Sequence, residues 1–140
     1  RGERQPGLQS LKQADGSFAS YYFGDDGVMR TGKQTIYNDD LEENQIWYFQ
    51  TKGSLKGQGY HGERDNQVYV NGLLKKADPE LRYEPVSIGE KRYLVNTSGT
   101  IQKATSSSSS ASRPELGKGF KDIKDSNDTV WTVDTSGIIQ

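Results

Sequence analysis

The side chains with the best-known catalytic chemistry are few in this chain, and their spacing does not suit catalysis. His61 is the only histidine and cysteine is absent, so a thiolate zinc site is excluded and no His-based triad or nucleophile elbow is found. The acidic pairs Asp25-Asp26 and Asp39-Asp40 lack the alternating ligand spacing of a calcium loop. Adjacent carboxylates also do not face each other across a sugar, as a glycosidase pair must. We therefore expect no enzymatic activity, no metal site and no cofactor.

Composition points to a folded chain with little apolar surface to bury. Hydrophobic residues make up only 31% of the 140 residues, although aromatic residues make up 10%. Repeat proteins fit this balance, because each unit buries its apolar face only against its neighbours. The net charge of −1 does not favour nucleic acid or an anionic membrane as partner. No run approaches the roughly 18 apolar residues of a membrane span, so membrane insertion is not expected.

A nine-residue pattern recurs along the chain and predicts an array of repeats. It reads aromatic, variable, apolar, three polar residues, glycine, variable, apolar. A shorter relative lies over 68–74, where Asn71-Gly72 between apolar residues is a strong hairpin signal. The four full copies cover residues 21–29, 47–55, 93–101 and 131–139.

The pattern is that of a strand followed by a turn. Residues two apart share one face of a strand, and glycine takes the positive φ that a turn needs at little cost. A second strand-like segment precedes each copy, so each unit is predicted to be a β-hairpin with its first aromatic residue in the core. We expect an all-β fold, a β-solenoid-like stack of about five short β-hairpins over 7–31, 32–57, 58–76, 81–103 and 117–140, with core aromatics Tyr21, Trp47, Tyr93 and Trp131.

The serine-rich stretch divides this array. The run of five serines from Ser106 to Ser110 is typical of a flexible linker. The predicted organisation is an array of four hairpin repeats over 7–103, a linker over 104–116 and a fifth hairpin repeat over 117–140. Whether the linker floats or lies on the surface stays open.

The segment Gly16–Gly32, with its Tyr21-Tyr22-Phe23-Gly24 and Met29-Arg30-Thr31-Gly32 strings, resembles one unit of the cell-wall-binding repeat family. This family includes choline-binding modules of Gram-positive surface proteins and autolysins, glucan-binding repeats of glucosyltransferases, and receptor-binding repeats of clostridial toxins. The resemblance is strong over 16–32, good over 43–62 and weaker over 89–103 and 119–140.

The resemblance implies stacked hairpins with ligands in the grooves between them. Quaternary ammonium ligands are held there by aromatic faces, and sugars stack on rings that have polar neighbours. The aromatic residue that follows glycine in the family pattern is replaced by Leu8 and Lys33 in the first units, by Tyr60 after Gly59, at best by Tyr83 in the fourth unit, and by Phe120 after Gly119. The expected ligand contacts in aromatic grooves are Trp47, Tyr60, Tyr69, Phe120 and Trp131.

These observations favour a non-catalytic cell-wall or carbohydrate-binding repeat module that anchors a larger secreted protein to the bacterial surface. The expected partners are cell-wall glycan, choline-bearing teichoic acid or glucan, and other domains of the parent protein. Mixed polar grooves suit a glycan at least as well as choline. One alternative is a structural or protein-interaction stalk whose repeats have lost their ligand sites. Another is a module that serves an enzyme domain outside this chain by multivalent binding.

Overall fold

The computed structural model describes residues 7–140, which form antiparallel β-structure without any α-helix. One short 3-10 turn, η1 (Pro114–Leu116), is the sole helical element of these residues. Among them, no helix has the length and apolar character that crossing a membrane needs. The all-β prediction is therefore confirmed for the described part of the chain. Contacts divide the chain into two compact units, which are treated separately below.

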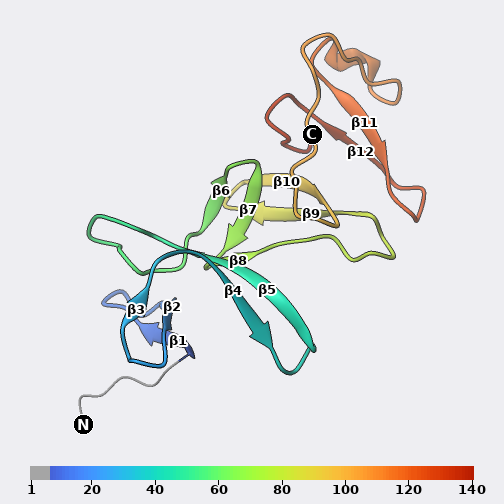
Figure 1. The fold of residues 1–140 in the computed structure, drawn as a ribbon. Coiled ribbons are helices and arrows are strands. Elements are labelled where there is room, and N and C mark those ends of the chain that lie inside the picture. Colours follow the sequence, from blue (N-terminus) through green and yellow to red (C-terminus); the bar gives the residue numbers. More distant parts are fainter. Residues whose placement is uncertain (1–6) are drawn as a thin grey trace. The chain divides into compact units, whose positions relative to one another are not determined.

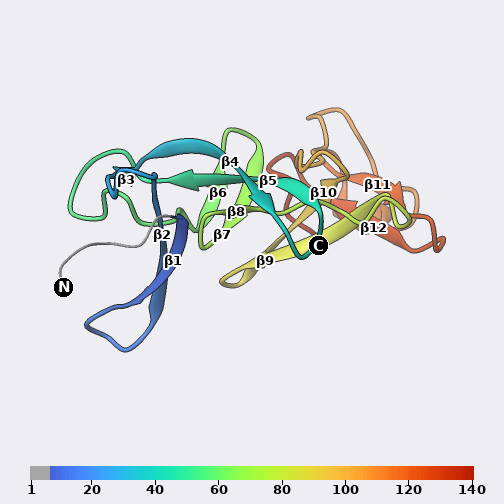
Figure 2. The ribbon, with the colours of Figure 1, turned by 60° about the horizontal axis from the view of Figure 1, so that its bottom comes forward.

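Unit 1 holds the described residues up to Gly62, together with Tyr69–Leu74. Its first sheet has the order β1-β2-β3, and Figure 2 shows the β1–β2 hairpin along its length. A second hairpin, β4–β5, pairs Gly32 with Phe49 and Asn38 with Glu43, and β8 continues this sheet beside β5. The strands of unit 1 are β1 (Gly7–Lys12), β2 (Phe18–Phe23), β3 (Met29–Arg30), β4 (Gly32–Asn38), β5 (Glu43–Phe49) and β8 (Leu73–Leu74).

Unit 2 holds Glu63–Val68 and Lys75–Gln140, so the boundary between the units passes through the third hairpin. Two further antiparallel hairpins follow, β9–β10 and β11–β12, and both are visible as separate two-stranded ribbons in Figure 1. The strands at the boundary are β6 (Gly62–Arg64) and β7 (Gln67–Val70), and those within unit 2 are β9 (Tyr83–Ile88), β10 (Lys91–Asn96), β11 (Lys121–Lys124) and β12 (Val130–Val133).

The turn that follows the second strand has the same hydrogen bonds in three of the four full copies. The residue that starts the turn donates its N–H to the carbonyl four positions on, and the glycine donates back to the starting carbonyl. These distances are 2.9 to 3.1 Å. In two copies the starting residue also caps the turn with its side chain, since Asn96 Oδ1 and Asp134 Oδ1 each accept two backbone N–H groups. The turns occupy residues 24–28, 96–100 and 134–138.

The second copy departs from this turn, and the nine-residue alignment over 47–55 is wrong there. Gln50 starts the turn, but the glycine that donates back to it is Gly57, seven positions later rather than three. Phe49 accordingly pairs with Gly59, whereas Leu55 is 50% exposed in the loop. Four extra residues therefore lengthen this turn, and Gly53 matches the pattern by sequence only.

Consecutive hairpins within each unit meet through the same pair of contacts. In unit 1 the N–H of Gly59 donates to the carbonyl of Ser20 at 2.8 Å, and in unit 2 the N–H of Ile139 donates to that of Arg92 at 2.7 Å. The glycine of the later hairpin's turn also lies against the last apolar residue of the earlier one. A Cβ on Gly57 would lie 2.1 Å from Met29 Sδ, and one on Gly137 would lie 2.2 Å from Ile101 Cγ2. Both glycines also have a positive φ, +88° and +87°, which disfavours any other residue at these points.

Side chains at the third position of the repeat pattern are more deeply buried than those at the first position. The third position is 0 to 3% exposed in every full copy: Phe23, Phe49, Val95 and Val133. At the first position, the predicted core location is confirmed for Trp47 and Tyr93, each 8% exposed, while Tyr21 and Trp131 are half-buried. Side chains at these two positions share a face of the strand, and the third lies further from the solvent.

The serine-rich stretch over 104–116, for which the sequence left open whether it floats or lies on the surface, is bonded to the fifth hairpin. Ser110 is 2% exposed, and its hydroxyl donates to the carboxylate of Asp122 on β11. The same carboxylate accepts the N–H and the hydroxyl of Ser112 at 2.9 and 3.0 Å, and the hydroxyl of Thr132 at 3.0 Å. The carboxylate of Asp122 therefore holds Ser110 and Ser112, while the carbonyl of Ser108 accepts the N–H of Gly119 at 2.7 Å. Composition alone does not reveal these contacts.

Candidate functional site

A cluster of three tyrosines forms on one side of the sheet in unit 1. Tyr48 on β5 lies 6.0 Å from Tyr60 and 5.9 Å from Tyr69, between ring centroids, and Tyr60 lies 6.4 Å from Tyr69. The Tyr48–Tyr60 and Tyr60–Tyr69 pairs are close to perpendicular, an arrangement that aromatic quadrupoles favour. Tyr69 is 1% exposed, so it supports the other rings from the interior and is not open to a ligand.

Trp47 belongs to the opposite side of the same strand. Its ring stacks on that of Phe49 at 6.0 Å, and Phe49 in turn stacks on Tyr22 at 6.1 Å. The structure therefore brings the predicted residues Tyr60 and Tyr69 together but separates Trp47 from them. Alternation along β5 is the physical reason, because neighbouring residues of a strand face opposite ways. Tyr48, which the sequence analysis did not select, takes the place beside the two tyrosines.

An open groove of about 480 Å³ lies beside Tyr60, and we name it the Tyr60 groove. Its size falls within the range of roughly 300–1,000 Å³ that small-molecule sites occupy. The lining combines exposed apolar surface, including Phe18 at 60% and Leu55 at 50% exposed, with amide and hydroxyl groups, and it carries no Asp, Glu, Lys or Arg. The lining residues are Ser17, Phe18, Ala19, Gln50, Leu55, Gln58, Gly59, Tyr60, His61 and Asn71.

The backbone at one side of the Tyr60 groove is held by hydrogen bonds on both flanks. The N–H of Tyr60 donates to the carbonyl of Tyr48 at 2.9 Å, and the N–H of Gly72 donates to the carbonyl of Tyr60 at 2.7 Å. His61 Nδ1 accepts the N–H of Asn71 at 3.2 Å. A neutral ring with this bond keeps its proton on Nε2, where it can act as a donor. His61 is thus a positioned polar group in the exposed turn region in which the sequence placed it.

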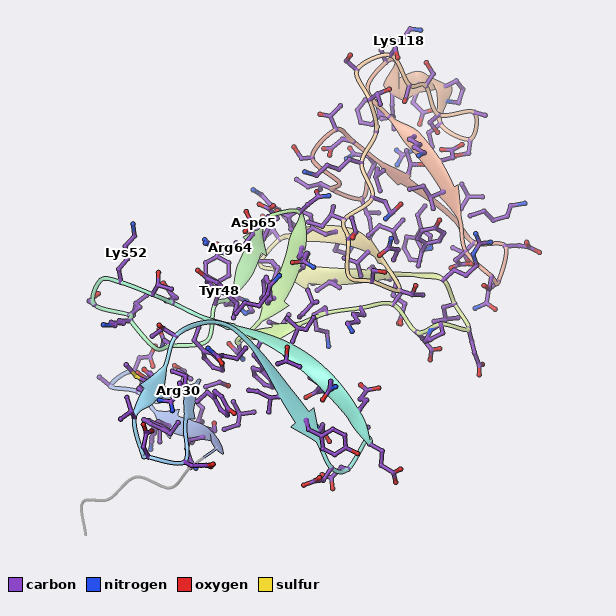
Figure 3. The ribbon with its side chains drawn as sticks, viewed as in Figure 1. Arg30, Tyr48, Lys52, Arg64, Asp65 and Lys118 are labelled. Atoms are coloured by element: carbon purple, nitrogen blue, oxygen red, sulfur yellow. The ribbon has the colours of Figure 1, made fainter. Side chains whose placement is uncertain are left out.

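The lengthened second turn, over residues 50–58, builds one wall of the Tyr60 groove. Gln50, Leu55 and Gln58 all belong to this loop and all line the groove. Lys52 extends outward from the same loop (Figure 3). The shorter turns over 24–28 and 134–138 supply no comparable wall, so the groove depends on the insertion as well as on Tyr60.

In unit 2, the predicted contact Trp131 borders a second open pocket of about 420 Å³, which we name the Arg92 pocket. The guanidinium carbon of Arg92 lies 5.9 Å from the centroid of the Trp131 ring. The indole Nε1 donates to Asp125 Oδ2 at 3.0 Å, which fixes the orientation of the ring. The lining residues are Arg92, Ser112, Arg113, Thr129, Val130, Trp131, Thr132, Ile139 and Gln140.

Phe120, the remaining predicted contact, is half-buried next to the serine-rich stretch, where its N–H donates to the carbonyl of Ser108 at 3.3 Å. It is not among the residues that line the Arg92 pocket. Phe120 and Trp131 therefore do not line the same pocket.

Two carboxylates near the Arg92 pocket are engaged by internal donors. The hydrogen bond from Trp131 Nε1, together with those from the N–H groups of Thr129 and Asn127, lowers the pKa of Asp125 more than its burial raises it. Burial raises the pKa of Asp122, but the donors of Ser110, Ser112 and Thr132 outweigh it and lower the pKa to about 2. Both side chains therefore stay ionised at neutral pH, with their oxygens directed at the protein.

Within residues 7–140, no group of three or more His, Asp or Glu side chains is placed to hold a metal ion. The sequence identified the aromatic character of the site, but it missed Tyr48, Phe18 and the amide groups of the inserted loop. Strand alternation could have pointed to Tyr48, whereas the inserted loop was hidden by the chance match of Gly53 and Leu55 to the repeat pattern. No protein-family model matches the chain, and no curated protein matches it either.

Proposed function

We propose that the chain is a non-catalytic, carbohydrate-binding repeat module, and that unit 1 binds a neutral sugar in the Tyr60 groove. The observation that carries this proposal is the lining of the groove, which offers aromatic and apolar surface beside Gln50, Gln58 and Asn71 but no charged side chain. Sugars present apolar ring faces and many hydroxyls, so they match a surface of this kind. Neutral glycans such as glucans are therefore the proposed ligands of this groove.

Choline is a weaker candidate for the same groove. A quaternary ammonium needs two or three ring faces around it, because each contact contributes only about 0.5–2 kcal/mol. Tyr69 is 1% exposed and supports Tyr60 from behind, so it adds no open face. Phe18 and Tyr60 are the aromatic residues that line the groove, and no carboxylate lies among them to compensate a cation.

We further propose that the five hairpins stack as a β-solenoid-like array of the cell-wall-binding repeat type. The support is the repeated seam, in which the Gly59–Ser20 bond of unit 1 has its counterpart in the Ile139–Arg92 bond of unit 2. The same glycine against the last apolar residue of the preceding hairpin recurs with Met29–Gly57 and Ile101–Gly137. The same contacts at one junction in each unit are what a nearest-neighbour array of similar hairpins would produce.

In this proposal the module anchors a larger secreted protein to the surface of a Gram-positive-type cell through wall glycan or glucan. The experiment below distinguishes these glycans from choline-bearing teichoic acid. The alternative of a protein-interaction stalk is favoured by the burial of Trp47 and Tyr69, at 8% and 1% exposure, since two of the predicted ligand contacts are closed.

The test is retention on purified Gram-positive cell walls and on immobilised dextran, each with and without excess choline. We expect retention that choline does not reverse. Phe18→Ala should weaken binding about tenfold, equivalent to about 1.4 kcal/mol, and Tyr60→Ala should weaken it at least as much. Phe18 is 60% exposed, so its replacement tests the groove without disturbing the tyrosine cluster.

Tyr37→Ala is the matched control, since Tyr37 is 56% exposed and does not line the Tyr60 groove. Its retention should equal that of the unchanged protein. Release by choline would replace the neutral-sugar proposal with a choline site. Absence of retention on both materials would favour the stalk.

A further inference from the structure

Arg92 is an exposed cation that the protein holds in place without neutralising it. It lies on β10, where it pairs with Ser87 of β9, and its carbonyl accepts the N–H of Ile139 at 2.7 Å. The ion pairs recorded among residues 7–140 involve Arg30, Arg64 and Arg113, and none of them includes Arg92. The backbone of Arg92 is therefore fixed by a strand while its charge stays available.

The contact with Trp131 orients this charge. The guanidinium carbon lies 5.9 Å from the indole centroid, and the indole itself is fixed by its hydrogen bond to Asp125. A guanidinium within about 6 Å of a ring centroid is attracted by the ring quadrupole, and its N–H donors match a carboxylate or phosphate. Arg92 therefore combines a position beside the indole with donors suited to bidentate recognition of an oxyanion.

From this geometry we propose that the Arg92 pocket is a second binding site, which takes an acidic group, a carboxylate or a phosphate, carried by a polyhydroxylated polymer, either a saccharide or a polyol. The site is separate in chemistry from the uncharged Tyr60 groove and does not depend on it. Arg113 adds a second guanidinium to the lining, although it is shared with Glu115 at 3.3 Å. Thr129 and Gln140 add polar side chains that suit sugar hydroxyls.

A cationic ligand is disfavoured in the same pocket. Arg92 already lies over the Trp131 ring at 5.9 Å, and its charge repels an ammonium group that would approach the indole. Asp122 and Asp125 are ionised, but their oxygens accept internal hydrogen bonds from Ser110, Ser112, Thr132, Trp131 and backbone N–H groups, so they are not free to contact an ammonium group directly. Trp131, which the sequence predicted as a choline or sugar contact, thus lies beside the arginine that is proposed to bind the anion.

The experiment measures binding of the full chain to three polymers: polygalacturonate, which carries carboxylates, poly(glycerol phosphate), which carries phosphates, and neutral dextran. We expect binding to at least one of the acidic polymers, which identifies the source of the oxyanion. Arg92→Gln should weaken this binding about tenfold or more, because one charge-assisted bidentate contact is lost. It should also reduce the salt dependence of binding, and it should leave retention on dextran unchanged.

Arg82→Gln is the matched control. Arg82 is also an exposed arginine of unit 2 near an aromatic ring, at 5.7 Å from the Tyr83 centroid, but it does not line the pocket. Arg92→Lys keeps the charge and removes the planar fork, so it should restore only part of the affinity. The proposal is overturned if neither acidic polymer binds, or if Arg82→Gln weakens binding as much as Arg92→Gln. Retention on dextran is measured independently of binding to the acidic polymers. Failure of the Arg92 proposal therefore does not affect the test of neutral-sugar binding in the Tyr60 groove.

Discussion

Replacement of Asp122 by asparagine should loosen the serine-rich stretch from the fifth hairpin. The carboxylate accepts hydrogen bonds from the hydroxyl of Ser110, from the N–H and hydroxyl of Ser112, and from the hydroxyl of Thr132. Asn keeps one acceptor oxygen and presents an NH₂ group to donors. Hydrogen bonds to charged groups contribute about 1.5–3 kcal/mol each, but they are not additive and this cluster is partly open to solvent. We expect Asp122→Asn to cost about 2 kcal/mol near pH 7.

The pH dependence of this cost distinguishes the charged cluster from a merely polar one. The pKa of Asp122 is lowered in the folded protein from 3.8 to about 2. A lowered folded-state pKa stabilises the fold at pH values above the ordinary pKa, and this contribution is lost as the pH falls from 3.8 through about 2. The difference between the two proteins should therefore be full at neutral pH and shrink below pH 3.8, where Asp122 itself becomes protonated.

Thermal unfolding followed by circular dichroism at several pH values measures this difference. A loss of about 2 kcal/mol should lower the midpoint by roughly 7 °C for a chain of 140 residues. Asp65→Asn is the control, because the Asp65 side chain is 84% exposed and its nearest cation, Arg64, lies 3.9 Å away. Equal losses for the two variants would refute the reasoning, as would a cost for Asp122→Asn that does not change as the pH is lowered.

Two further predictions concern the repeat turns. Gly137→Ala should lower the free energy of unfolding by about 2–4 kcal/mol, because its Cβ would lie 2.2 Å from Ile101 Cγ2 and its φ of +87° is strained for alanine. Gly89→Ala is the control, since Gly89 has a φ of +60° but nothing within 4 Å. It should cost only about 1 kcal/mol in chemical denaturation. Equal costs would show that the seam is not tightly packed. Deletion of residues 51–54 should restore the three-residue spacing found after Gly24, retain the β-sheet circular dichroism signal, and abolish dextran retention; unchanged retention would show that the inserted loop is not part of the sugar site.

The sequence predicted the hairpins of the fold better than it predicted the residues that come together at the candidate site. The hairpins over 7–31, 81–103 and 117–140 were predictable, because their turns carry glycine at the position that needs a positive φ, as at Gly27, Gly99 and Gly137. Trp47 was correctly expected in the core. The separation of Trp47 from Tyr60 and Tyr69 was not predicted. The pattern identifies which residues share a face of one strand, but not which neighbouring strand covers that face.

The amino-acid sequence by itself determined that this chain forms hairpins, since alternation and turn glycines act over a few residues. Tertiary structure decided where open surface remains. It buried Tyr69, joined Tyr48 to Tyr60, attached Ser110 to Asp122, and placed Arg92 over Trp131. These contacts join residues from different hairpins or from the stretch between them, and their energies depend on three-dimensional proximity that no local spacing encodes. The pattern thus determines the repeating unit, and the packing of units on one another determines which rings can meet a ligand.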